Sequence, residues 1–70
     1  MKILDLHGMY HDSVQRKVEN FVLSNETPLK IVTGGSPRMK ELVFQILDRH
    51  DFRYYPENYA NFGAFIVINK

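Results

Sequence analysis

Apolar and polar positions divide the chain into four short apolar runs and two amphipathic segments. The first run, about residues 2–7, alternates apolar with polar side chains and is too short for a helix, so it predicts a strand. Further strands are predicted at residues 29–32, 52–55 and 62–68. The last of these is almost continuously apolar, which is typical of a strand at the centre of a sheet or one covered on both faces.

The two amphipathic segments have the spacing of helices. From Val14 apolar residues recur at i, i+4, i+7 and i+8, so a helix is expected to begin there, with Asp12 as its N-cap, and to end near Asn25. The second segment follows Ser36, a good N-cap, and Pro37, which suits a first helical position. Its apolar stripe consists of Met39, Leu42, Val43, Ile46, Leu47 and His50.

The predicted elements follow one another as β-α-β-α-β-β. A strand, a helix and a strand in so short a length form a right-handed βαβ unit, so the first two strands should be parallel. We therefore predict a single domain over residues 1–70 with an α/β fold, an α+β sandwich in which a mixed four-stranded sheet packs against two helices. Residues 57–61 are expected to form a polar loop that carries Tyr59.

Composition excludes several classes of protein. The 70 residues suffice for one domain and contain no cysteine, which removes disulfides and cysteine-based metal sites. Without cysteine ligands a dedicated zinc site is not expected. We find no signal peptide and no apolar run near the roughly 18 residues of a membrane span. A soluble, cytoplasmic protein without a membrane partner is therefore expected, and a monomer.

Positive charge is unevenly distributed, although the net charge is only +1. Residues 30–40 contain three cations and no acid, namely Lys30, Arg38 and Lys40. The cations therefore surround a glycine-containing segment, residues 33–37. Chance clustering on a solvated surface explains such a distribution as well as a binding site does.

Two short motifs carry the candidate chemistry. Residues 4–8, Leu-Asp-Leu-His-Gly, place Asp5 and His7 on the same face of a strand. Residues 33–36, Thr-Gly-Gly-Ser, form a turn that opens the second helix. Parallel strands end at one edge of the sheet, where ligands of α/β proteins bind, and a glycine turn before a helix favours an anion there. We expect a phosphate-handling site at this edge.

The expected roles follow from the side chains. His7 is the expected general acid or base, and Asp5 would orient it or hold a cation, for which a divalent metal ion such as Mg²⁺ or Mn²⁺ stays open. Structural roles stay open as well, because a histidine at a strand end often bonds only to a turn and Gly-Gly-Ser-Pro is often only a capped turn. The expected substrate-binding residues are Gly8, Tyr10, Thr33, Gly34, Gly35, Ser36, Arg38 and Lys40.

The remaining histidines and tyrosines are assigned more simply. His11 is expected at the surface, and His50 as a packed or capping residue of the second helix. Tyr10, Tyr55 and Tyr59 are candidates for stacking on bases at the edge of the site, with a half-buried packing role as the alternative for Tyr55.

These residues, in this order, resemble the Smr (small MutS-related) domain family. The resemblance is carried by residues 4–8, 31–36 and 63–67, covers nearly the whole chain, and leads us to expect a compact, stand-alone version of the domain. It implies a β-α-β-α-β-β domain with both helices on a mixed four-stranded sheet. It also implies binding of DNA or RNA, with nicking or endonuclease activity in several members.

The resemblance also assigns roles to residues. Asp5 and His7 match the LDxH positions that the family uses in cleavage. Thr33, Gly34 and Gly35 match the start of its His/Thr-Gly-x-Gly turn, which is implicated in substrate binding. The family turn usually continues with a second spaced glycine and often a lysine, which this chain lacks.

Arg38 or Lys40 would replace the missing lysine. Two main functions are predicted, beside a simpler third option, a protein-interaction domain that uses the same edge of the sheet. The first is a nicking endonuclease, a phosphodiesterase acting on structured DNA or RNA. The alternative is a non-catalytic module that binds nucleic acid or a ribosomal or replication partner.

Overall fold

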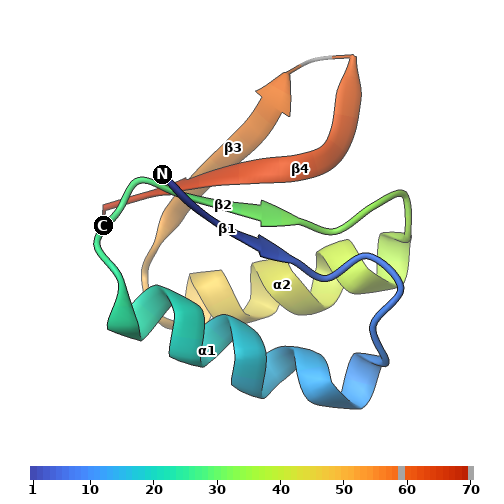
Figure 1. The fold of residues 1–70 in the computed structure, drawn as a ribbon, viewed down its shortest axis with the longest axis horizontal. Helices are drawn as coiled ribbons and strands as arrows, with labels where there is room; N and C mark the ends of the chain where they lie inside the picture. Colours follow the sequence, from blue (N-terminus) through green and yellow to red (C-terminus); the bar gives the residue numbers. More distant parts are fainter. Residues whose placement is uncertain (59, 70) are drawn as a thin grey trace.

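Four strands and two helices account for most of residues 1–58 and 60–69, which are the residues that the computed structural model describes. Figure 1 shows both helices on one face of a single sheet. The predicted α+β class and the β-α-β-α-β-β order are confirmed, with one short 3-10 helix added before the first α-helix. The elements are β1 (Lys2–Asp5), η1 (His11–Ser13), α1 (Val14–Ser24), β2 (Leu29–Val32), α2 (Pro37–Arg49), β3 (Arg53–Asn58) and β4 (Asn61–Ile68).

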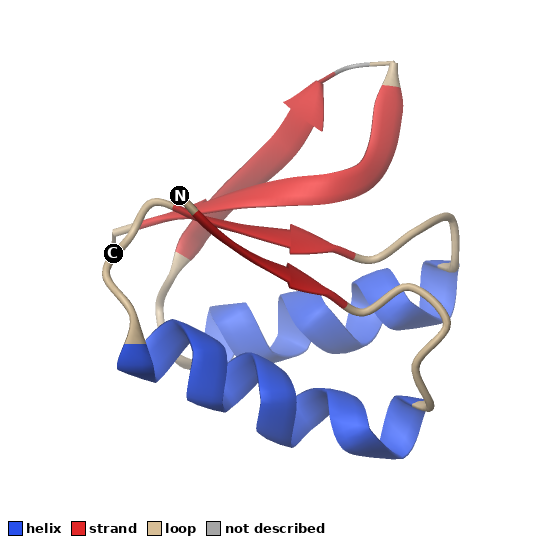
Figure 2. Cartoon of the chain, in the orientation of Figure 1, coloured by secondary structure: helices blue, strands red, loops and turns tan. Residues whose placement is uncertain are grey.

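The sheet has the strand order β1-β2-β4-β3. β1 and β2 are parallel, as predicted for a βαβ unit, and β4 pairs antiparallel with both β2 and β3. β4 therefore lies inside the sheet, which confirms the prediction from its apolar sequence. Figure 2 shows that the far end of the β3–β4 hairpin extends away from the helices.

The core lies between the sheet and the helices. Leu29 and Ile31 of β2 pair with Val67 and Phe65 of β4, and these four side chains are buried on the helical side. The intervening residues of each strand point to the opposite face, which carries no helix. From the helices the buried residues are Val14, Val18, Val22, Met39, Val43, Ile46 and Leu47, which recur at the predicted spacing.

β1 is shorter than predicted, because it ends at Asp5 rather than at residue 7. Leu6 is still buried, and its N–H donates to a carbonyl of β2 at 2.8 Å. The Leu6 carbonyl then accepts a hydrogen bond from the Met9 N–H at 3.0 Å, which closes a turn. Gly8 has a φ of 80° in this turn, a value that favours glycine at its third position. His7 therefore belongs to a turn and not to the strand.

In the β3–β4 hairpin, by contrast, the first strand is longer than predicted. A strand at residues 52–55 and a polar loop at 57–61 were expected, whereas β3 spans Arg53–Asn58. The strand continues through Pro56 because β3 is at the edge of the sheet, where a missing N–H leaves no partner unsatisfied. Tyr59 lies outside the described residues.

The carboxyl end of α2 is closed by a Schellman motif. The Phe52 N–H donates to the Leu47 carbonyl at 2.9 Å, and the Asp51 N–H to the Asp48 carbonyl at 3.1 Å. Asp51 has a φ of 61° and occupies the left-handed position that glycine usually takes. No helix within residues 1–58 and 60–69 is long and apolar enough to cross a bilayer.

Candidate functional site

The two sequence motifs leave the sheet at the same edge. β1 and β2 are parallel, so the residues that follow them emerge side by side, and Figure 1 shows α2 beginning at this edge. We call it the carboxyl edge and define it by residues 5–10 and 33–40. It contains every residue that was predicted to act in catalysis or substrate binding.

The ring of His7 packs directly against Gly34. A Cβ atom placed on Gly34 would lie 3.2 Å from Cδ2 of His7, which is closer than nine in ten contacts of real Cβ atoms. Gly34 also has a φ of 69°, in the left-handed region. Any side chain at this position would both strain the backbone and press on the imidazole. The glycine therefore brings the two motifs into contact.

Asp5 positions His7 through the main chain. Its Oδ1 atom accepts a hydrogen bond from the His7 N–H at 2.9 Å, and both side chains are exposed. The recorded contact is thus with the amide and not with the imidazole. In the described part of the chain neither ring nitrogen of His7 has a hydrogen-bond partner, so both nitrogens are available to a ligand.

The first half of the glycine turn has a structural role. Thr33 is buried, its N–H donates to the Gly63 carbonyl at 2.8 Å, and its hydroxyl donates to the Gly34 carbonyl at 3.0 Å. The Gly34 N–H also donates to the Gly63 carbonyl, at 3.0 Å. The Gly34 N–H, which was expected to bind phosphate, is therefore already hydrogen-bonded to β4. Thr33 stabilises the turn through its own hydrogen bonds.

The second half of the turn retains free donors. The Ser36 hydroxyl accepts a hydrogen bond from the Met39 N–H at 3.1 Å, which confirms Ser36 as N-cap, and Pro37 follows at the first helical position. The backbone N–H groups of Gly35, Ser36 and Arg38 donate to none of the described residues. Gly35 and Ser36 precede α2 and Arg38 lies in its first turn, where N–H groups have no intrahelical partner.

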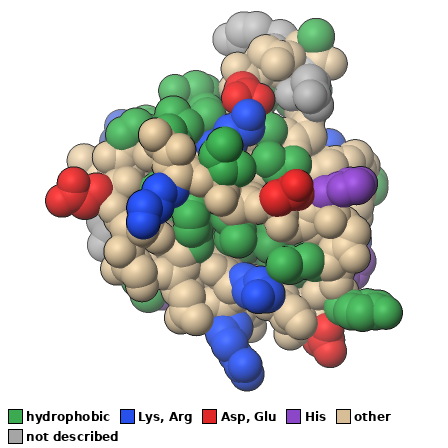
Figure 3. Space-filling view, in the orientation of Figure 1, with side chains coloured by type: hydrophobic (Ala, Val, Ile, Leu, Met, Phe, Trp, Pro, Cys, Tyr) green, Lys and Arg blue, Asp and Glu red, His purple; other side chains and the backbone are tan. Residues whose placement is uncertain are grey.

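The three cations of residues 30–40 have different partners. Lys30 pairs with Glu57 at 2.6 Å, and Arg38 approaches Glu41 at 3.4 Å with both side chains more than half exposed. Lys40 forms no ion pair with any residue that the structure describes. On the face that Figure 3 shows, lysine and arginine side chains are spread out and not gathered in one patch. Of these three cations, Lys40 is therefore the most available to a negatively charged ligand.

A hollow of about 390 Å³ opens beside the glycine turn, on the sheet face that carries no helix. Both Gly34 and Gly35 contribute to its wall. We call it the sheet hollow; the other residues that line it are Lys30, Val32, Lys40, Glu57, Ala60, Phe62, Gly63 and Ala64. Phe62 and Glu57 were not predicted as site residues, and Lys30 was grouped only with the cations around residues 33–37. Their grouping depends on strand register, which local patterns do not contain.

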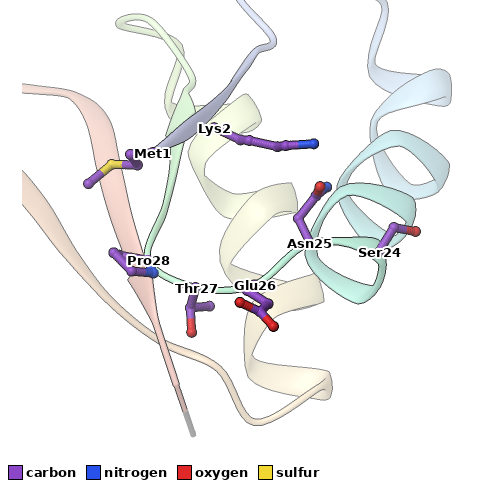
Figure 4. Close-up of a pocket in the computed structure, with 7 residues that line it drawn as sticks. All are labelled: Met1, Lys2, Ser24, Asn25, Glu26, Thr27 and Pro28. Atoms are coloured by element: carbon purple, nitrogen blue, oxygen red, sulfur yellow. The ribbon is translucent and has the colours of Figure 1, made fainter.

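Another hollow lies at the opposite end of β1 and β2. Figure 4 shows that its wall is formed by the first two residues of the chain and by the segment that joins α1 to β2. Its charged residues are Lys2 and Glu26, and it contains no glycine turn and no predicted site residue. Nothing in its chemistry favours the reactions considered for the carboxyl edge.

The tyrosines are not gathered at the site. Tyr10 follows the turn of Gly8 at the carboxyl edge, is 85% exposed, and contributes its carbonyl to the N–H of Ser13. Tyr55 lies on the sheet face without helices but lines a different hollow with Thr27. Tyr10 therefore remains the one described tyrosine available beside His7.

The other two histidines are not part of the candidate site at the carboxyl edge. His11 is exposed in η1, as predicted. His50 is the C-cap of α2, and its Nε2 lies 2.9 Å from Oε2 of Glu19 on α1, which confirms the predicted packing or capping role. This contact holds the pKa of Glu19 below its ordinary value of 4.5.

Residues 1–58 and 60–69 contain no group of three or more histidine, aspartate and glutamate side chains that could hold a metal ion, so the donor set does not match a resident Mg²⁺ or Mn²⁺ centre.

The fold and the site together define an α+β domain in which an accessible histidine packs on a glycine turn at the start of a helix. Comparison with protein-family models, with curated proteins and with solved structures found no match for the chain.

Proposed function

We propose that the chain is a nucleic-acid-binding domain of the Smr type, a nicking endonuclease that hydrolyses a phosphodiester of structured DNA or RNA. The observation that carries the proposal is the packing of the His7 ring on Gly34. It joins a group that can transfer a proton to a turn that can receive an anion. The motif resemblance described above supports the same function.

Binding of the phosphodiester would involve the start of α2. The free N–H groups of Gly35, Ser36 and Arg38 would bind the phosphate as helix N-termini bind anions, and Lys40 would add a full charge. Gly34 holds His7 in place and does not donate to the phosphate, since its own N–H is bonded to Gly63. Arg38 contributes less charge than Lys40, because Glu41 lies beside it.

Cleavage would use His7 as the general base. Its unpartnered ring nitrogen accepts a proton from a water molecule while the water oxygen adds to phosphorus. The bond from phosphorus to the leaving sugar oxygen breaks, and solvent supplies the proton that this oxygen gains. The N–H groups at the start of α2 stabilise the negative charge on the non-bridging oxygens, a contribution of a few kcal/mol for such donors. One water molecule is consumed for each bond broken.

A specific contact favours the alternative function, a non-catalytic module that binds nucleic acid. In hydrolytic sites a carboxylate usually holds the imidazole ring in its working orientation. Here the Asp5 carboxylate bonds instead to the main-chain N–H of His7. In this second function His7 would contact the bound phosphate without transferring a proton.

Cleavage assays on supercoiled plasmid and on structured RNA distinguish the two functions. We expect His7→Ala to lower nicking about 100-fold or more, in line with the contribution of a general base, while binding persists. His11→Ala is the matched control, because His11 is also exposed but lies in η1. Equal cleavage by the wild type and His7→Ala, or none by either, overturns the endonuclease.

Binding assays at several salt concentrations test the part that both functions share. We expect Lys40→Ala to weaken binding and to lower its dependence on salt, because one phosphate contact is lost. Arg16→Ala, which removes a cation from the exposed side of α1, should change neither. Absence of binding, or binding that does not respond to salt, overturns both functions.

A further inference from the structure

The sheet hollow is continuous with the proposed phosphate site. Gly34 and Gly35 line the hollow, and Gly34 also contacts the ring of His7. Lys40 extends from the first turns of α2 to the same hollow. A group bound there would therefore lie next to a phosphate held at the start of α2. The volume, about 390 Å³, is within the range of pockets that bind small organic molecules.

An exposed aromatic ring forms part of the wall. Phe62 alternates with Ala64 along β4, so its side chain lies on the sheet face without helices, and it is 48% exposed. A large apolar ring left in contact with water next to a polar site offers a stacking surface. Stacking on an aromatic side chain is the main way in which proteins hold single bases, whatever their identity.

Another part of the wall is an ion pair that crosses the sheet. Lys30 is on β2 and Glu57 on β3, so their 2.6 Å contact spans the central strand β4. The pair presents a hydrogen-bond donor directly beside an acceptor. The Watson–Crick edge of every base also carries a donor beside an acceptor, and unpaired bases are recognised through these edges. Because Glu57 neutralises Lys30, this part of the wall does not compete with Lys40 for the phosphate.

We propose that the sheet hollow receives an unpaired nucleobase adjacent to the bound phosphodiester, stacked on Phe62 and facing the Lys30–Glu57 pair. This inference rests on the proposed function and names its substrate class, namely structured nucleic acid with an unpaired nucleotide at the bound phosphate. A base inside a duplex has both faces covered and its Watson–Crick edge occupied, so it cannot enter such a hollow without leaving the stack.

Small probes separate the base from the phosphate. The ¹⁵N-labelled chain is titrated with adenosine 5′-monophosphate, uridine 5′-monophosphate and ribose 5-phosphate, which carries the same phosphate without a base. We expect all three to shift the amide signals of Gly35 and Ser36, and only the nucleotides to shift those of Phe62 and Ala64. The nucleotides should bind about tenfold more tightly than ribose 5-phosphate, as expected for one stacked base.

Matched variants locate the effect. Phe62→Ala should abolish the difference between the nucleotides and ribose 5-phosphate, and Phe62→Leu, which keeps an apolar side chain without a flat face, should do the same if Phe62→Ala fails to fold. Tyr55→Ala is the control, because Tyr55 is 49% exposed on the same sheet face but outside the hollow. Its binding of nucleotides should equal that of the wild type.

Oligonucleotides complete the test and keep the two proposals apart. A duplex with one unpaired nucleotide should bind about tenfold more tightly than the same duplex fully paired, and Phe62→Ala should remove the difference. Equal binding of both duplexes, or of nucleotides and ribose 5-phosphate, overturns the base site while the phosphate site stands. Failure of every phosphate-bearing probe to bind overturns both.

Discussion

The two ends of α2 differ in how their polar groups are partnered. At its carboxyl end His50 pairs with Glu19, the Tyr54 hydroxyl donates to Asp48 at 2.9 Å, and the last carbonyls are bonded in the Schellman motif. At its amino end the His7 ring, the Lys40 ammonium and three backbone N–H groups have no partner among the described residues. One end uses its polar groups for stability, whereas the other leaves them available to a ligand.

Aromatic packing adds to the contrast. Near the carboxyl end Tyr54 stacks on Phe44 with ring centroids 4.8 Å apart, and Phe44 meets Phe65 edge to face at the same distance. Tyr10 and Phe62, close to the amino end, take no part in such packing and lie exposed, as does Tyr55 on the sheet face without helices. Since the domain is small and its stability margin narrow, unpartnered hydrogen-bond donors at one end of α2 are more easily explained by a ligand than by folding. Substitutions at either end of α2 test this division of roles.

The largest effect is expected for Gly34→Ala. The substitution places an L side chain at a φ of 69° and pushes the His7 ring, so we expect the free energy of unfolding to fall by about 2 kcal/mol. Cleavage or binding should fall further than stability alone explains, because His7 moves. Gly35→Ala is the control: nothing lies within 4 Å of a Cβ atom there. Urea denaturation of both variants measures the difference, and equal losses would contradict the role given to Gly34.

An effect of opposite sign is expected at the carboxyl end. Asp51 holds a left-handed conformation that glycine adopts without strain, so Asp51→Gly should raise the free energy of unfolding by about 1 kcal/mol. Phosphate or nucleic-acid binding should not change, because the residue lies at the other end of α2. Asp51→Ala, which loses the aspartate without relieving the backbone, should give no gain. Thermal denaturation compares the variants; a change in ligand binding would break the division of roles.

Local sequence signals account for most of the predicted fold. Residues 29–32 were predicted with the observed bounds, and the start of α2 was found because Ser36 and Pro37 act within one turn of the helix. The N-cap of α1 was wrong by one residue: Ser13 occupies it, and Asp12 belongs to η1. A 3-10 turn before an α-helix changes the cap without changing the apolar pattern, so periodicity does not detect it.

The candidate site was predictable only in part. The meeting of His7 with Gly34 follows from parallel strands, which the lengths of the elements imply. The bond from the Gly34 N–H to Gly63 depends on a pairing between β2 and β4 that no local pattern specifies. The same pairing creates the sheet hollow. Sequence thus identified the residues that carry the chemistry, whereas the long-range register decided which of their donors stay free.

Alkaline titration examines the aromatic packing at the carboxyl end. Burial, together with the hydrogen bond to Asp48, raises the pKa of Tyr54 from 10.0 to about 12. A folded-state pKa above the unfolded one means that the contribution to stability is complete below pH 10 and is lost as the pH rises through about 12. Tyrosinate absorbance should therefore show a late phase near pH 12 that Tyr54→Phe removes. A late phase that survives this substitution would contradict the assignment.

The smallest effect is expected at the pair that joins α1 to α2. The contact with His50 lowers the pKa of Glu19 from 4.5, so its contribution to stability is complete above this pH and is lost as the pH falls through the lowered value. Because the pair is partly exposed to solvent, the change should be small and reduced by salt. Glu19→Gln should lower the denaturation midpoint at neutral pH and leave it nearly unchanged in acid. The opposite result is expected for His7→Gln, because no hydrogen-bond partner of the His7 ring is found among the described residues. This variant should keep the denaturation midpoint of the wild type at both pH values and lose cleavage. A lower midpoint for His7→Gln would show that the amino end of α2 also contributes to stability.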